Sequence, residues 1–168
     1  MKNLDTSINR LLQAGTVIPA HPLALDQNLR IDEKRQRALT RYYMASGAGG
    51  VAVGVHTTQF EIREPSIGLL EPVLKMAADE IEKAALNRPF IKVAGICGPL
   101  KAALEEAEMA LKYGYQLGLL SMGGLASSSE AELIKRAQAV AEKIPVIGFY
   151  LQPAVGGRLL SYEFWREF

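Results

Sequence analysis

Residues 49–63 read GGVAVGVHTTQFEIR, an apolar run that leads into four hydrogen-bonding side chains, His56, Thr57, Thr58 and Gln59. The apolar part lacks polar alternation, and a short continuous run of this kind is typical of a strand covered on both faces, as in parallel α/β sheets. The carboxyl ends of such strands are where α/β proteins place their ligand-binding groups. The stretch therefore predicts a buried strand that delivers polar side chains to a site.

The composition is that of one globular domain. The chain has 168 residues, of which 49% are hydrophobic and 22% are charged, so it can bury a sizeable core. Nineteen basic and eighteen acidic residues leave a formal net charge of +1. This balance gives no electrostatic reason to expect nucleic acid or an anionic membrane as a partner, whereas small neutral or anionic metabolites remain open.

Cysteine and histidine usage limits the chemistry further. Cys97 is the single cysteine, which excludes an internal disulfide and is too few for a cysteine-based zinc site. His21 and His56 are the only histidines, so we expect no metal, and no glycine run has the form of a nucleotide-binding motif, so we expect no cofactor. The N-terminal residues contain no apolar signal core, and no run of about eighteen apolar residues follows. We expect a cytoplasmic protein.

Strands and helices alternate along the chain. Apolar runs predict strands at residues 16–20, 50–55, 90–97, 116–121 and 145–150. Helical spacing of apolar residues predicts helices at residues 31–45, through 73–81, at 100–113, at 126–143 and from residue 160 onward. This order is the (βα) repeat of one α/β domain with a parallel sheet. It fits a doubly wound open sheet and the first part of an eight-stranded barrel equally well.

Three features of the predicted helices can be checked directly. Asp32 is expected to cap the helix at residues 31–45, and the glutamates of the helix at residues 100–113, Glu106 among them, are expected to point outward. The last helix carries three large aromatic residues, Phe164, Trp165 and Phe168, with no later strand to cover. Either it packs back on the strand at residues 145–150, or the chain is part of something longer with open sheet edges that need a partner.

Thr57 and Thr58 are the first candidates for ligand binding. Two adjacent hydroxyls with their backbone N–H groups can bind a carboxylate, although a threonine-rich turn or helix cap is the alternative. His56 could act as a general acid or base or be a structural group. Tyr150 ends a predicted strand at the same edge of the sheet, where its phenol could relay a proton or make a single buried hydrogen bond.

Two weaker candidates lie at the same edge. Cys97 could line a pocket, although an isolated thiol is more often a small buried hydrophobe. Arg158, after Gly156 and Gly157, could bring a guanidinium to an acid group, although a glycine turn before a helix explains the glycines as well. The residues by themselves therefore predict a small-molecule site at the strand ends without defining its reaction.

Four segments taken together resemble a known family: VIPAHPLALDQNLRID (residues 17–32), SGAGGVAVGVHTTQF (46–60), KVAGICG (92–98) and PVIGFYLQPAVGGR (145–158). They resemble the dihydrodipicolinate synthase and N-acetylneuraminate lyase family of class I aldolases over essentially the whole chain. The resemblance implies an α/β fold, in which residues 1–168 form a single partial (β/α)₈ TIM-barrel domain of about five (βα) units, truncated before strand six.

The resemblance also implies roles for site residues. In that family a Gly-Thr-Thr-Gly-Glu motif after strand two binds the carboxylate of a pyruvate-like 2-oxo acid, and Thr57 and Thr58 match its threonines. Tyr150, in Tyr-Leu-Gln-Pro, resembles the catalytic tyrosine of strand five, which stands in Tyr-Asn-x-Pro. The positions that depart from the threonine motif are candidates for substrate choice: His56, Gln59 and Phe60.

Other departures argue against the lysine-biosynthesis activity of the synthase branch. Residues 121–125 read SMGGL where that branch has a paired-tyrosine loop, and Val155 stands where it has an arginine for its semialdehyde substrate. Arg158 is the candidate to substitute for that arginine.

The family's Schiff-base lysine, on strand six, would lie beyond Phe168. Lys92 does not replace it, because it falls at the start of a strand, the stability end of a barrel. We expect the N-terminal part of a homo-oligomeric aldolase acting on pyruvate or a related 2-oxo acid, inactive as this chain. The alternative is a non-catalytic half-barrel scaffold or binding module that dimerises through its open sheet edges.

Overall fold

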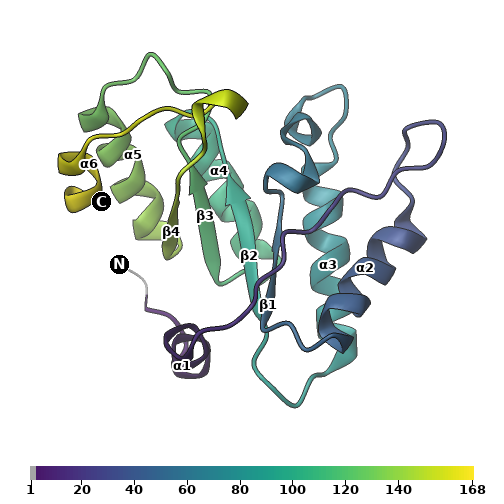
Figure 1. Cartoon of the computed structure of the whole chain (residues 1–168). Coiled ribbons are helices and arrows are strands. Elements are labelled where there is room, and N and C mark those ends of the chain that lie inside the picture. Colours follow the sequence, from purple (N-terminus) through teal and green to yellow (C-terminus); the bar gives the residue numbers. More distant parts are fainter. Residues whose placement is uncertain (1–2) are drawn as a thin grey trace.

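A computed structural model describes residues 3–168 and contains one sheet of four parallel strands in the order β1-β2-β3-β4 (Figure 1). The strands are β1 (Gly50–Val53), β2 (Ile91–Ile96), β3 (Leu117–Ser121) and β4 (Val146–Phe149). The helices are α1 (Thr6–Ala14), α2 (Glu33–Ala45), α3 (Leu70–Ala84), α4 (Leu100–Lys112), α5 (Glu130–Lys143) and α6 (Tyr162–Glu167). None of these helices, all within the described residues, has the length and apolar character needed to cross a bilayer.

The first predicted strand, residues 16–20, is an extended segment that bonds to β1 as a further parallel strand would. The N–H of Ala52 donates to the carbonyl of Pro19, and the carbonyl of Ala52 accepts from the N–H of His21. Only Ala20 forms a regular bridge, with Ala52. Pro19 faces β1 and has no N–H to donate to it, so the pairing is reduced to this one bridge.

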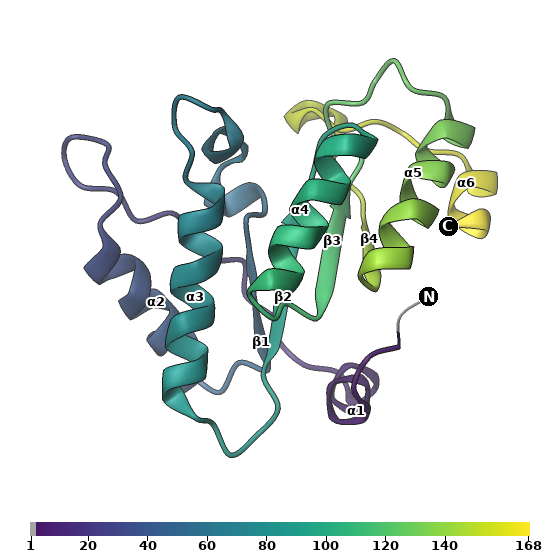
Figure 2. The ribbon, with the colours of Figure 1, turned by 180° about the vertical axis from the view of Figure 1, so that it is seen from behind.

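The strand order decides between the two architectures that the sequence left open. Each strand pairs in parallel with the next one along the chain, as in the wall of a (β/α) barrel. A doubly wound sheet would reverse its strand order and carry helices on both faces. Here α3, α4 and α5 lie on one face of the sheet (Figure 2). The partial barrel is confirmed.

Alternate strand residues divide between two cores. Val51, Val53 and Ile96 point toward the helices and belong to the larger core. Ile91 and Val93 point to the opposite, inner face, where a smaller cluster forms. An inner and an outer set of side chains along every strand is the pattern of a barrel wall.

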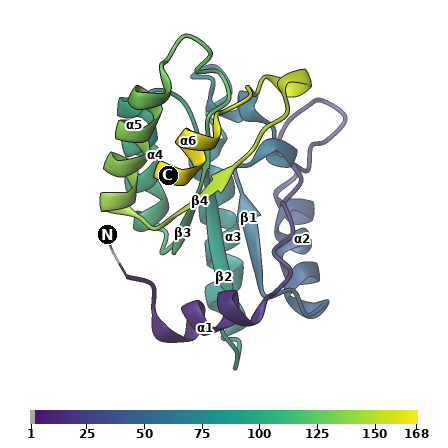
Figure 3. The same ribbon diagram turned by 60° about the vertical axis from the view of Figure 1, so that its left-hand side comes forward.

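Helix α1 was not predicted, although its signals are visible in the sequence. Asp5 caps it by accepting from the N–H of Ser7, and Ile8 packs on the inner cluster with Leu11 and Leu12. Figure 3 shows α1 lying across the amino-terminal ends of the strands. It therefore closes the end of the inner face that is opposite to the predicted site.

Helix starts were predicted well because they depend on local capping. Asp32 caps α2 by accepting from the N–H of Arg35. Ser129 and Glu132 form a reciprocal capping box at the start of α5. Helix α4 begins one residue after Pro99, as the sequence indicated.

Helix α6 packs back on β4, which was the first of the two predicted alternatives. Phe164 is buried, and its ring centroid lies 5.2 Å from that of Trp165 and 6.0 Å from that of Phe168. The rings of Trp165 and Phe168 lie on Gly148, where a Cβ atom would come within 2.8 Å of Phe168. The glycine thus provides the flat surface that these rings need.

Candidate active site at the carboxyl ends of the strands

The carboxyl ends of all four strands surround a small hollow on the inner face of the sheet. Eight residues line it: Val55, His56, Phe60, Gly95, Cys97, Leu119, Ser121 and Phe149. This is the end at which (β/α) barrels place their active sites. Two of the predicted site residues, His56 and Phe60, line the hollow directly.

The threonine pair lies in a tight turn, His56–Thr58, that follows β1. Thr58 is fully buried, and its hydroxyl donates to the carbonyl of His21 at 2.7 Å while it accepts from the N–H of Gly54 at 3.0 Å. Thr57, in contrast, is exposed. The hydroxyl of Thr58 therefore holds the turn in place, whereas that of Thr57 is exposed.

The same turn offers backbone donors. The N–H groups of His56 and Thr57 stand at its start, where a helical turn has no internal acceptors for them. Gln59 ends the turn with a φ of +71° and donates from its N–H to the carbonyl of His56. Amide groups exposed at the start of such a turn are suited to an anionic oxygen.

His21 supports this turn through its backbone carbonyl, which accepts from the Thr58 hydroxyl. The sequence did not suggest this role. Its ring is fully buried and lies 2.9 Å from the Thr40 hydroxyl, through Nε2, and 2.9 Å from the Pro22 carbonyl, through Nδ1. Burial lowers its pKa below the usual value, although the bond to Pro22 opposes this shift. The ring is therefore neutral at physiological pH, and it fixes the backbone carbonyl that receives the Thr58 hydroxyl.

A buried ion pair, Arg63–Glu106, joins α4 to the carboxyl ends of β1 and β2. Arg63 Nε donates to Glu106 Oε1 at 2.7 Å, and its Nη2 donates to the carbonyls of Gly54 and Gly95. Glu106 also accepts from the N–H of Cys97. The expectation that Glu106 points outward is wrong: it is only 9% exposed. Its partner is 43 residues away in sequence, so helical periodicity could not reveal the pair.

Cys97 contributes a neutral thiol to the hollow. Burial raises its pKa to about 11, and the nearby Arg63 guanidinium offsets only part of that shift. A thiol with this pKa carries very little thiolate at neutral pH, so it is a poor nucleophile. Its chemistry at the hollow is that of a small, weakly polar side chain.

The remaining predicted residues follow β4. Tyr150 comes directly after Phe149, which lines the hollow, and its side chain is 47% exposed. Arg158 donates from Nη1 to the carbonyl of Ser128 at 2.6 Å, which ties the loop after β4 to the loop after β3. Tyr150 therefore lies at the predicted edge and is accessible, whereas the Arg158 guanidinium is engaged between two loops.

No lysine is among the residues that line the hollow. Lys92 lies at the opposite end of β2, where its Nζ donates to the carbonyl of Tyr113 at 2.9 Å. No group of three or more metal-ligating side chains occurs within residues 3–168. The part of the chain described here thus offers hydrogen-bond donors, a phenol and a hydrophobic rim.

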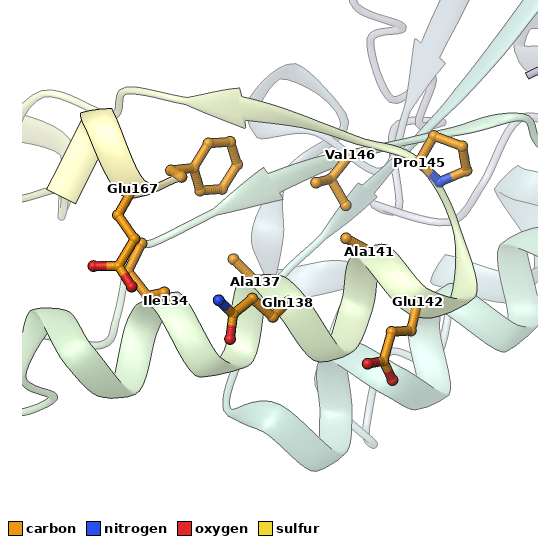
Figure 4. A pocket seen from close by; sticks show the side chains of 9 residues that line it. Ile134, Ala137, Gln138, Ala141, Glu142, Pro145, Val146 and Glu167 are labelled. Atoms are coloured by element: carbon orange, nitrogen blue, oxygen red, sulfur yellow. The ribbon is translucent and has the colours of Figure 1, made fainter. Parts of the chain in front are cut away.

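A wider groove lies away from the hollow, on the helical side of β4. Figure 4 shows its lining by α5, the start of β4 and the end of α6: Ile134, Ala137, Gln138, Ala141, Glu142, Pro145, Val146, Glu167 and Phe168. Its walls are largely aliphatic, and it contains no nucleophile. It is therefore a packing surface and not the candidate site.

Comparison with known proteins agrees with the architecture. No protein-family model and no curated protein matches the sequence. The structure matches dihydrodipicolinate synthase from Oceanobacillus iheyensis with a TM-score of 0.74 at 16% identity, over 90% of this chain and 48% of that one. It matches N-acetylneuraminate lyase from Fusobacterium nucleatum with a TM-score of 0.72 at 19% identity, over 90% and 51%.

The chain spans about half the length of the solved structures that it matches. The resemblance expected from the sequence thus reappears in the fold, which is that of the first half of these barrels.

Proposed function

We propose that the chain is the N-terminal part of a Schiff-base aldolase that adds pyruvate, or a related 2-oxo acid, to a carbonyl compound or reverses that reaction. The observation that carries the proposal is the turn His56–Thr58, which presents amide donors and an exposed threonine hydroxyl at the carboxyl end of β1. The fold that this chain has in common with aldolases of known structure supports it.

The 2-oxo acid would be held through its carboxylate. One oxygen would accept from the N–H groups of His56 and Thr57, and the other from the Thr57 hydroxyl. Thr58 would contribute by fixing the turn through His21 and Gly54. Such an arrangement would bind the carboxylate without an ion pair to a buried cation, so the bound 2-oxo acid could still dissociate.

Tyr150 would move the proton at the carbinolamine and aldol steps. Its phenol is accessible and stands at the end of β4, at the same edge of the sheet as the threonine turn. The Schiff-base lysine would be supplied by strand six, beyond Phe168, and the chain of 168 residues alone would be inactive.

His56 and Phe60, which line the hollow, would set substrate choice. His56 and Phe60 meet edge to face, with ring centroids 5.7 Å apart, at the positions where the family motif has glycine and glutamate. Gln59 and Arg158 are further candidates. The loop after β3 carries Gly123 and Gly124 and no tyrosine, so we do not propose the lysine-biosynthesis reaction.

The test is reductive trapping of the Schiff base. Borohydride added to the intact protein with pyruvate should leave a covalent adduct on a lysine outside residues 1–168, detected by mass spectrometry of peptides. No mass gain would refute the aldolase. An adduct on the 168-residue chain alone would refute the claim that the reactive lysine lies elsewhere.

The coding sequence after Phe168 provides an independent check. A strand that carries a lysine, followed by about two more (βα) units, is expected from a complete barrel of eight. A stop codon at that point would instead support the half-barrel scaffold, which would close its open edges in a homo-oligomer. No contact among the described residues favours the scaffold over the aldolase.

A further inference from the structure

Two polar side chains of α2, Gln36 and Thr40, are buried although neither is among the residues that line the hollow. Gln36 is 2% exposed and Thr40 is 1% exposed. They are four residues apart, so they lie on one face of the helix. Burying an amide or a hydroxyl costs free energy unless the group is hydrogen-bonded, so the bonds of these two side chains show what they hold in place.

Gln36 and Thr40 hold residues 21–24, the segment that leads from the first extended segment toward α2. The N–H of Ala24 donates to Gln36 Oε1 at 2.7 Å, and Gln36 Nε2 donates to the carbonyl of Pro22 at 3.2 Å. The Thr40 hydroxyl oxygen lies 2.9 Å from Nε2 of the fully buried His21 ring. Helix α2 thus fixes this segment through a ring, a carbonyl and an N–H.

The same segment provides the acceptor of the Thr58 hydroxyl. The N–H of His21 donates to the carbonyl of Ala52 in β1 at 2.8 Å, and the carbonyl of His21 accepts from the Thr58 hydroxyl at 2.7 Å. Thr58 ends the threonine turn, His56–Thr58, whose first N–H groups are the proposed donors to the carboxylate. Hydrogen bonds among buried groups therefore connect α2, through His21, to this turn.

The polar character of this connection favours one position of the turn. Apolar side chains could fill the same space without the cost of burying polar groups. In a fully bonded polar network, however, a shift of one segment leaves a buried donor or acceptor unpaired, which is costly. The binding of an anion by backbone N–H groups depends on where those groups point, and a misplacement of about 1 Å at a site can cost about a hundredfold.

We infer that Gln36 and Thr40 are positioning residues for the 2-oxo acid: they orient the donors of the threonine turn through His21, without contacting the acid themselves. The inference rests on the proposed function. It gives α2 a role at the site, although none of the site residues expected from the sequence lies on that helix.

The test is borohydride trapping on the intact protein with pyruvate and, separately, with methyl pyruvate, which has no ionised carboxylate. Thr40→Val removes the hydroxyl at nearly constant volume and is expected to raise the half-saturating pyruvate concentration about tenfold. The half-saturating methyl pyruvate concentration, and the amount of adduct at saturation, should not change. Thr40→Ser keeps the hydroxyl and should restore the wild-type value for pyruvate. Equal weakening of both ligands by Thr40→Val, or of neither, would overturn the inference.

Gln36→Met is a second variant, because it removes the amide and keeps the length of the side chain. It should weaken pyruvate binding as Thr40→Val does. The double variant should weaken it by less than the product of the two single effects, since both act through residues 21–24. Val140→Ala, a core truncation on α5 that removes no polar group, is the control for destabilisation. A similar effect on pyruvate in Val140→Ala, at an equal decrease in the urea midpoint, would overturn the inference.

Trapping at saturating pyruvate separates the two proposals. An adduct on the wild-type protein, together with an unchanged half-saturating pyruvate concentration in Thr40→Val and Gln36→Met, refutes only this inference. The absence of any adduct on the wild-type protein refutes the aldolase and, with it, this inference.

Discussion

Two neighbouring threonines have different environments and should respond differently to the same change. Thr58→Val removes a hydroxyl that serves the buried groups of His21 and Gly54, and is expected to lower the free energy of unfolding by about 1–3 kcal/mol. Thr57→Val, at an exposed position, should change it by less than about 0.5 kcal/mol. Urea denaturation of the 168-residue chain measures the free energy of unfolding of both variants. Equal losses would contradict the conclusion that the Thr58 hydroxyl, and not that of Thr57, holds the turn in place.

Thr57→Val should nevertheless have a functional effect in the intact protein. If the exposed hydroxyl donates to the carboxylate of the 2-oxo acid, the loss of this donor weakens binding of the acid by about 1.5–3 kcal/mol. Titration with pyruvate, in the presence of borohydride to trap the bound fraction, provides the measurement. An unchanged half-saturating pyruvate concentration would exclude Thr57 from the site.

His21 should make stability depend on pH in a window where few other groups titrate. Its pKa is lowered in the folded chain, so as the pH falls below the reference value of 6.5 the unfolded chain binds the proton first. The stability that the neutral His21 ring contributes is therefore fully present above pH 6.5. It is lost as the pH falls through the folded-state pKa of His21. Urea midpoints at pH 7.5 and pH 5 should differ more for wild type than for His21→Gln, with the exposed His56→Gln as the control.

Between elements, the pair Arg63–Glu106 joins α4 to the ends of β1 and β2. Glu106→Ala would leave a largely buried guanidinium unpaired and the Cys97 N–H without its acceptor, so we expect a loss of about 3–5 kcal/mol in the free energy of unfolding. Glu108→Ala, on the same helix, breaks only an exposed pair with Lys143 and should cost less than about 1 kcal/mol. Comparable losses in the two variants would mean that the buried pair stabilises the fold no more than the exposed pair does.

Element positions were predictable where local signals decide them. The strands and the helices α2 to α5 lie close to the predicted ranges, because apolar runs, caps and glycine or proline boundaries are read from neighbouring residues. Residues 16–20 were predicted as a strand but form an extended segment with a single bridge to β1, since Pro19 has no N–H to donate to that strand. Helix α1 was missed although its cap, Asp5, is visible in the sequence, because the inner face that its apolar residues cover is formed by strands far along the chain.

At the scale of the whole molecule, the inner face and the edge beside β4 are only partly covered. Leu119 and Ile147 on that face, and Val146 in the groove beside α5, are half-buried. The 168-residue chain should therefore bind the dye 8-anilinonaphthalene-1-sulfonate, while the intact protein, with these surfaces covered, should bind it several-fold less. The comparison is a fluorescence titration at equal chain concentration, and equal binding would contradict the proposal that this chain is the N-terminal part of a longer barrel.

The sequence by itself determined the four strands and the helices α2 to α5, and it placed Thr57, Thr58 and Tyr150 at strand ends, because these features depend on residues that are neighbours along the chain. Only the tertiary structure decided that the strands are ordered as a barrel wall, that Glu106 is buried against Arg63, and that Thr58 is held by His21 while Thr57 is free. Those outcomes depend on contacts between residues tens of positions apart. Such pairings are formed by packing and hydrogen bonding in three dimensions and leave no periodic signal in the chain.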